Sequence, residues 1–470
     1  MKKLDVSLIL FLFCNFVFGQ NPLVKQWDKR FGGTAYENLS CFLQTNDGGY
    51  ILAGWSDSGL SGDKTQGTWG FHDYWIVKTD YLGNKQWDKD FGGIDIDWFT
   101  FLQQTKDGGF ILGGSSQSGI SGNKTQGIWG FHDYWILKTD SLGNYQWDKD
   151  FGGTDYDELF SLQQTSDGGY ILGGWSVSGI SGDKTQADWG IHDYWIVKTD
   201  SSGIKQWDKT FGGTNVDKLQ SLQQTADKGY ILGGYSNSGI NGNKTQDTRG
   251  LEDYWIIKTD SLGNKQWDKD FGGTNSDYLS SVLQTADGGY VLAGISSSGP
   301  NGDKTQANWD TLCNPFCHYD YWIIKTDSLG NKQWDKDFGG TANEELFSIQ
   351  QTDDGGYLIS GDSYSTLSGD KTENNLGFEQ NWIIKTDSLG NKQWDKTILT
   401  TGHDEIGLAI KIQDGCFAFA NSSNGGIGGY KTQLAWGGTY DYWMVKFCDT
   451  TLTTNLTPAL SKGEGVAIAP

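Results

Sequence analysis

An acidic residue recurs seven times at nearly constant intervals, at Glu37, Asp97, Asp157, Asp217, Asp277, Glu344 and Asp404. Carboxylates gathered around one opening could bind a hard cation, which prefers several oxygen ligands, or the hydroxyl groups of a sugar. Alternatively, each acid caps backbone N–H groups of its own loop, as Asp does in turns. Seven bare carboxylates would repel one another, so local hydrogen bonds or a cation must compensate.

Other polar residues also repeat. A Lys-Thr pair occurs in every repeat, with the lysine at Lys64, Lys124, Lys184, Lys244, Lys304, Lys371 and Lys431. A calcium loop would not place a lysine among its carboxylates, so we expect each lysine to pair with a neighbouring Asp. His72, His132 and His192 share one repeat position. This repetition indicates a scaffold role, because chemistry needs one asymmetric place.

No dedicated catalytic motif is present. The sequence has no Gly-x-Ser-x-Gly elbow and no His-Glu-x-x-His pair, so it predicts no catalytic residues, no metal site and no cofactor. A pair of carboxylates acting on a polysaccharide remains open, because Asp is frequent throughout the chain.

The elements that would position these residues follow from a repeat. Trp-Asp-Lys begins at Trp27, Trp87, Trp147, Trp207, Trp267, Trp334 and Trp394. One repeat predicts four short strands, Leu159 to Thr165, Tyr170 to Ser176, Tyr194 to Asp200 and Lys205 to Phe211, joined by glycine-containing turns. The composition, with 68 Gly, 22 Trp and only 5 Pro in 470 residues, excludes collagen, coiled coil and disorder. A net charge of −22 disfavours nucleic acid as a partner.

Four-stranded units repeated around an axis are typical of a β-propeller, although stacked β-domains or a solenoid are alternatives. The chain ends discriminate between them. The first repeat element is an outermost strand at Trp27, and the last is a third strand from Tyr442 to Phe447. In a closed ring, the N-terminal strand completes the last blade and removes both exposed edges. We therefore predict an all-β fold, a seven-bladed β-propeller over residues 24–447.

Cysteines add to this prediction. Cys416 lies in the first turn of the last repeat, and Cys448 ends its third strand, so both fall at one edge of the closing blade. We predict a Cys416–Cys448 disulfide, worth ~2–4 kcal/mol. Cys313 and Cys317 lie in a seven-residue insertion in the fifth repeat and are expected to close a small loop. Cys41 is left as a buried free thiol.

The two ends of the chain differ in composition from the repeats. Residues 1–19 have a short basic start and an apolar run from Val6 to Phe18, which predicts a cleaved signal peptide. Residues 448–470 form a Thr-rich linker. The apolar run is too short to span a bilayer, and no later segment is apolar enough to do so.

The repeat motif Gly152-Gly153, Asp157, Gln163-Gln164-Thr165, Asp167-Gly168-Gly169-Tyr170 and Asp193-Tyr194-Trp195 has counterparts in most repeats. It resembles a family of secreted propeller repeats common in Bacteroidetes-type bacteria. The resemblance implies type IX secretion, directed by a small C-terminal β-domain that would begin where this sequence stops. Either the sequence is a truncated fragment or the sorting signal is absent.

These observations favour an exported, non-catalytic scaffold, secreted or at the cell surface. We expect a monomeric disc that binds extracellular protein, glycan or cell-surface material through its loop-rich face. The seven repeated acids are the candidate binding residues at the channel mouth. The alternatives are a polysaccharide-active hydrolase or lyase with acids at that mouth, and a purely structural surface module.

Overall fold

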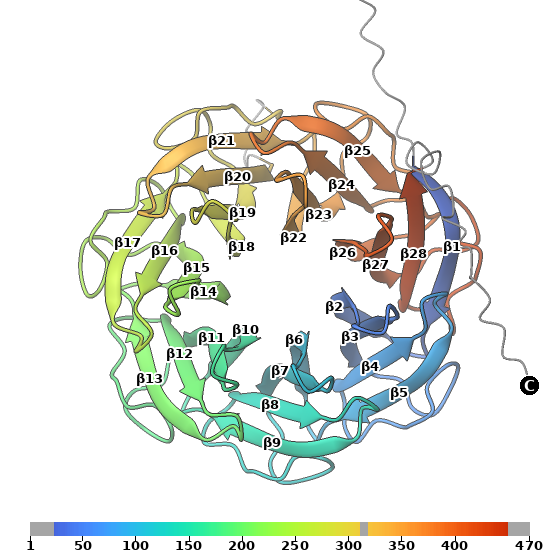
Figure 1. The fold of residues 1–470 in the computed structure, drawn as a ribbon, viewed down its shortest axis with the longest axis horizontal. Helices are drawn as coiled ribbons and strands as arrows, with labels where there is room; N and C mark the ends of the chain where they lie inside the picture. The colour runs from blue at the N-terminus through green and yellow to red at the C-terminus, as the bar shows by residue number, and fades with distance from the viewer. Residues whose placement is uncertain (1–22, 311–317, 450–470) are drawn as a thin grey trace, which may run out of the picture.

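The computed structural model describes residues 23–310 and 318–449. Within them, twenty-eight strands form seven antiparallel four-stranded sheets, arranged as blades around a central channel (Figure 1). The predicted seven-bladed propeller is confirmed. The predicted signal peptide, most of the linker, and Cys313 and Cys317 lie outside the described residues.

Each blade runs from an innermost strand beside the channel to an outermost strand at the rim. Blades I to III contain β2 (Glu37–Gln44), β3 (Tyr50–Ser56), β4 (Asp73–Thr79), β5 (Lys85–Phe91); β6 (Asp97–Gln104), β7 (Phe110–Ser116), β8 (Asp133–Thr139), β9 (Tyr145–Phe151); and β10 (Asp157–Gln164), β11 (Tyr170–Ser176), β12 (Asp193–Thr199), β13 (Lys205–Phe211). Blades IV and V contain β14 (Asp217–Gln224), β15 (Tyr230–Ser236), β16 (Asp253–Thr259), β17 (Lys265–Phe271); and β18 (Asp277–Gln284), β19 (Tyr290–Ser296), β20 (Asp320–Thr326), β21 (Lys332–Phe338). Blades VI and VII contain β22 (Glu344–Gln351), β23 (Tyr357–Ser363), β24 (Gln380–Thr386), β25 (Lys392–Ile398); and β26 (Asp404–Lys411), β27 (Phe417–Ser423), β28 (Asp441–Asp449), β1 (Leu23–Phe31).

Blade VII joins the two ends of the propeller. Its sheet order is β1-β28-β27-β26, and β1 pairs antiparallel to β28 with Arg30 opposite Trp443 and Phe31 opposite Tyr442 (Figure 1). The N-terminal strand therefore completes the last blade, as the chain ends predicted. Closure satisfies the backbone groups of two strands that would otherwise be exposed edges.

Aromatic side chains of the third strands fill the space between blades. Trp195 and Tyr194 of β12 are fully buried. The Tyr194 hydroxyl donates to the Trp255 carbonyl of the next blade at 2.9 Å, and the two rings lie 4.9 Å apart. The outermost-strand Trp207 packs edge-on against Tyr230 of the next blade. The repeated tryptophans thus hold adjacent blades together, as predicted.

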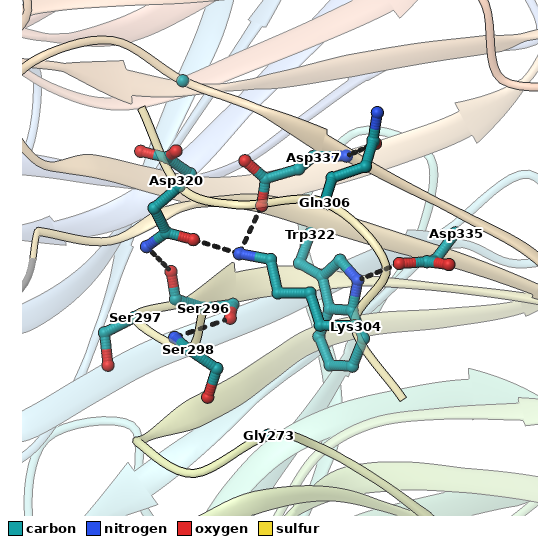
Figure 2. Close-up of polar contacts among 12 residues, drawn as sticks. Gly273, Ser296, Ser297, Ser298, Lys304, Gln306, Asp320, Trp322, Asp335 and Asp337 are labelled. Carbon is teal, nitrogen blue, oxygen red and sulfur yellow. Dashed lines mark hydrogen bonds and ion pairs between the residues drawn. The ribbon is translucent and has the colours of Figure 1, made fainter. Parts of the chain in front are cut away.

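A polar network ties each long loop between the second and third strands to the outermost strand. In blade V, Lys304 forms an ion pair with Asp337 at 2.5 Å, and the Trp322 indole donates to Asp335 at 3.1 Å (Figure 2). The Thr305 backbone N–H also donates to Asp335 at 2.9 Å. This loop covers the blade's outer edge, which blocks edge-to-edge pairing. The expected lysine–Asp pairing holds in blades I to V, whereas Lys371 donates to Asn375 and Lys431 to Ser423.

The cysteine predictions have two outcomes within the described residues. Cys416 and Cys448 form the predicted disulfide, with their Cα atoms 4.3 Å apart. It links the turn before β27 to the end of β28, in the blade that closes the ring. Cys41 is a free thiol but only half-buried. The expected burial is confirmed in part: Cys41 lies on the innermost strand β2 and borders the channel, but burial still raises the pKa of its thiol to about 11.

Candidate functional site

The seven predicted acids each begin an innermost strand, and all are fully buried. Asp157 is representative: its carboxylate accepts from the Gly153 backbone N–H at 2.7 Å and from the Ser178 hydroxyl at 2.9 Å. These bonds fix the preceding loop, in keeping with the capping interpretation. Burial raises the pKa of Asp157 to about 7, which relieves the repulsion expected between bare carboxylates. Since none of the seven is exposed, ligand binding by these acids stays a prediction.

The side chains around the acids form a collar at the same mouth of the channel. The backbone N–H of each acid bonds to the carbonyl of the residue just before the third strand of the preceding blade, as Asp97 does with His72 at 2.7 Å. Five positions per blade therefore meet there. From blade I to blade VII the collar consists of Tyr36, Ile96, Tyr156, Val216, Ser276, Asn343, His403; Asn38, Trp98, Glu158, Lys218, Tyr278, Glu345, Glu405; Trp55, Ser115, Trp175, Tyr235, Ile295, Asp362, Ser422; Asp57, Gln117, Val177, Asn237, Ser297, Tyr364, Asn424; His72, His132, His192, Glu252, Tyr319, Glu379 and Tyr440.

Aromatic rings run along much of the collar. Trp55 lies with its ring centroid 4.2 Å from that of His72, and Tyr36 stacks on Trp55 at 5.2 Å. Further ring pairs at 4.7–5.9 Å continue this arrangement, some within a blade and some between adjacent blades: Tyr36–Tyr440, Trp98–His132, His132–Tyr156, Trp175–His192, Tyr235–Tyr278, Tyr278–Tyr319 and His403–Tyr440. Rings with a polar tip, next to carboxylates and imidazoles, suit ligands that combine apolar faces with hydroxyl groups.

The collar changes from blade to blade, although the blades are otherwise close copies. The residue after the acid is Asn, Trp, Glu, Lys, Tyr, Glu and Glu in blades I to VII. Solvent exposure alone does not explain why the collar residues differ between blades, because an exposed position elsewhere keeps the same residue in most blades. The turn before the outermost strand has an exposed Leu in five blades, at Leu82, Leu142, Leu262, Leu329 and Leu389. The repeated motifs do not mark the collar; the signal in the sequence that marks it is the set of positions at which otherwise similar repeats differ.

One sector of the collar, between blades VI and VII, is acidic. The His403 imidazole contacts the carboxylate of Glu379 through Nε2, and its Nδ1 lies 3.7 Å from Glu405. Its Nδ1 also lies 2.6 Å from the Tyr440 hydroxyl. Burial raises the pKa of Glu379, and burial together with the charges of Glu379 and Glu405 raises the pKa of Glu345. The pKa values of these two carboxyls therefore lie closer to neutral pH than the pKa of an exposed glutamate.

The innermost strand of blade VII is irregular in this sector. The pairing of β26 with β27 shifts between Glu405 and Leu408, and Ile406 has a positive φ of 59°. The buried Asp362 accepts from the backbone N–H groups of Ile406 at 2.8 Å and Gly407 at 3.0 Å. A β-branched residue in this conformation is strained, and such strain is common near functional sites. The carboxylate of Asp362 stabilises the bulge where other blades have Trp, Tyr, Ser or Ile.

Two cavities lie along the channel. One of about 490 Å³ is lined by residues of the innermost strands, including Phe99, Phe160, Phe347 and Ile406. A second, of about 370 Å³, opens beside the collar between blades III, IV and V. Over residues 23–310 and 318–449, no group of three or more His, Cys, Asp or Glu side chains is placed to hold a metal ion.

Comparisons with known proteins give no family. No family model matches the sequence. The regulatory protein FlaEY of Caulobacter vibrioides is 28% identical over 187 residues, which are 37% of this chain and 19% of FlaEY. The chain thus matches about a fifth of that relative's length.

Several solved structures align with most of the chain at low identity. A protein of unknown function from Dyadobacter fermentans is 8% identical, with 91% of this chain and 99% of that chain covered and a TM-score of 0.44. YCF48 bound to D1 peptide is 9% identical, with coverages of 91% and 95% and a TM-score of 0.42. A PL25 ulvan lyase is 12% identical, with coverages of 93% and 100% and a TM-score of 0.46.

Proposed function

We propose that this protein is an exported, non-catalytic propeller that binds a carbohydrate chain at the collar. The observation that carries the proposal is the set of aromatic and polar side chains that differ from blade to blade on an otherwise constant scaffold. A sugar ring has an apolar C–H face that packs on aromatic rings, and its hydroxyl groups bond to carboxylates, imidazoles and amides. A rigid ring of blades holds these groups in place before the ligand arrives.

Export is the less direct part of the proposal. It is supported by the apolar N-terminal run and by the resemblance to secreted propeller repeats. The Cys416–Cys448 disulfide is consistent with it, because such bonds persist in oxidising compartments. Within the described residues, no helix is long and apolar enough to cross a membrane.

Binding of the purified protein to a glycan array, followed by calorimetry with the best oligosaccharide, tests the proposal. Trp175 of the collar and Trp189, a half-exposed loop residue, belong to the same blade. Replacing Trp175 with Ala should weaken binding at least about tenfold, since a buried aromatic contact at a binding site carries much of the affinity. Trp189→Ala should leave affinity unchanged. Failure of every saccharide to bind, or equal losses in both variants, would contradict the proposal.

The acidic sector favours a second candidate, a hydrolase or lyase acting on a polysaccharide. Glu379, His403 and Tyr440 form one hydrogen-bonded group, and carboxyls of raised pKa are suited to general acid–base work. Incubation with polysaccharides would distinguish the candidates. New reducing ends alone indicate hydrolysis, and unsaturated products indicate a lyase. Glu379→Gln should then abolish turnover, while Glu373→Gln, in a loop of the same blade outside the collar, retains it; no product at all supports the binding scaffold.

A further inference from the structure

Lys218 occupies an unusual position in the collar. It is the only lysine or arginine among the collar residues. It follows the buried Asp217 on β14, and its ammonium lies 4.3 Å from the centre of the Trp175 ring in the preceding blade. Among the described residues it has no hydrogen bond and no ion pair within 4 Å. Burial lowers the pKa of Lys218, which is the cost of holding a cation there without a counter-ion.

The nearby acids do not neutralise this lysine. Glu158 lies 3.5 Å from the Nδ1 atom of His132, and Glu252 accepts a hydrogen bond from Ser276 at 2.7 Å. The charge of Glu158 raises the pKa of Lys218, but less than burial lowers it. His192, next to Trp175, has a lowered pKa because of burial and the charge of Lys218. This sector is therefore the one part of an acidic collar that has a cation available for a ligand.

A cavity adjoins the lysine. It has a volume of about 370 Å³, within the range of about 300–1,000 Å³ typical of ligand pockets. Lys218, Trp175, Tyr235 and Tyr278 line it, together with Gln220 and Ser280. The Tyr235 and Tyr278 rings meet edge to face at 4.8 Å. Glu158 and Phe160 line it as well, so four aromatic rings, one ammonium, one carboxylate and two neutral polar side chains border one space.

We propose that this cavity is a subsite for a sugar ring bearing an anionic group, either a uronate carboxylate or a sulfate ester. The ring packs against Trp175 and the two tyrosines, and the anionic group pairs with the Lys218 ammonium in a half-buried setting, where a charge-assisted hydrogen bond is strong. Gln220 and Ser280 bond to hydroxyl groups. The acidic sector across the channel repels the same anionic group and so directs it to blades III to V. This inference rests on the proposed carbohydrate binding.

The test compares Lys218→Gln with Lys228→Gln. Lys228 lies in the same blade, in the exposed turn at the opposite end of the innermost strand. Its replacement by Gln removes the same single positive charge. Calorimetry would use three probes of equal length: an oligogalacturonate, a sulfated oligosaccharide and a neutral glucan oligomer. Thermal melting would confirm that both variants fold.

We expect at least one anionic probe to bind at least about tenfold more tightly than the neutral probe, with an affinity that falls as salt is raised. Lys218→Gln should remove this preference for an anionic probe over the neutral probe, and Lys228→Gln should change neither the preference nor the affinity for the neutral probe. The probe that loses affinity identifies carboxylate or sulfate as the group recognised. If saccharides bind with no preference for charge, or Lys218→Gln keeps the preference, the subsite inference is wrong and carbohydrate binding stands. If no probe binds, both proposals fail.

Discussion

Trp195 and Trp175 lie on neighbouring strands of blade III, one residue apart in register, and have different roles. Trp195 is fully buried, donates to Asp208 at 3.2 Å, and has a tryptophan counterpart in every other blade. Trp175 lies in the collar, borders a cavity and contacts Lys218, and its counterparts include Ser, Ile and Asp. In this repeat protein, the positions that stay the same build the disc, and the positions that change supply its chemistry.

The largest expected effect is a difference in stability between the variants of these two tryptophans. Trp195→Ala should lower the free energy of unfolding by about 3–5 kcal/mol, because it leaves a large cavity between blades and removes the indole hydrogen bond to Asp208. Trp175→Ala should cost less, about 2–3 kcal/mol, because its ring, although only 7% exposed, borders an open cavity on one side. Denaturant unfolding of both variants measures the difference. Equal losses of stability in the two variants would contradict the distinction between tryptophans packed between blades and tryptophans of the collar.

Closure of the ring should give the next largest effect. Reduction of the Cys416–Cys448 disulfide should lower stability by about 2–4 kcal/mol, because the bond restricts the unfolded chain around blade VII. Thermal melting with and without reductant measures the loss. Cys416→Ser should match the reduced protein, while the channel-lining Cys41→Ser provides the control for reductant acting elsewhere. A melting temperature insensitive to reductant would show that β1 pairing alone holds the ring.

The buried carboxyl groups between and within the blades predict an unusual dependence of protein stability on pH. Burial raises the pKa of Asp157, Asp193 and Asp320 to about 7, from an ordinary value of 3.8. The folded state therefore binds more protons than the unfolded chain between about pH 4 and 7, and stability falls as pH rises through this range. We expect the melting temperature to be a few degrees higher at pH 5.5 than at pH 8. A maximum at pH 8 would contradict the assignment of these acids to buried positions.

Other carboxyl groups have a lowered pKa in the folded protein, and they limit its stability at acid pH. Hydrogen bonds with Thr165 and Gly169 and the charge of Lys198 together outweigh burial and lower the pKa of Asp167 to about 2. Its contribution to stability is present above about pH 4 and is lost as pH falls toward 2. Melting curves below pH 4 should therefore show the second decline. Asp157→Asn should weaken the decline above pH 5 and leave the acid limb unchanged.

The smallest expected effect on stability concerns a turn in which one blade has a lysine and the other blades have glycine. Lys228 has a φ of 68° in a turn where the other six blades have Gly. Lys228→Gly should stabilise the protein by about 0.5–1 kcal/mol, because relief of the left-handed strain exceeds the extra entropy of glycine in the unfolded chain. Chemical denaturation can resolve this gain. A loss of stability would mean that the lysine side chain makes a compensating contact.

Much of the disc could be predicted from the sequence because the signals are linear. The 60-residue spacing of Trp-Asp-Lys gives the blade unit, and the surplus outermost strand at Trp27 requires a ring. The strands Tyr170–Ser176 and Lys205–Phe211 have their predicted bounds. The Cys416–Cys448 pair followed from antiparallel neighbours that end at one edge. In each case residues of one strand or hairpin carried the information.

The candidate site was only partly accessible in this way. The seven acids were placed beside the channel, but their burial depends on serines and glycines of a neighbouring loop, such as Ser178 and Gly153 around Asp157. The collar joins side chains from different blades, as Trp175 with Lys218, so no local pattern reveals it.

The sequence by itself thus determined the blade, the number of blades and how the ring closes, because these depend on period and count. Only the tertiary structure decided which side chains face the mouth of the channel, since the curvature of the ring brings together residues from different blades. It also decided that blade VII bulges at Ile406, where a buried Asp362 binds two backbone N–H groups. Contacts between blades, absent from any single repeat, set both features.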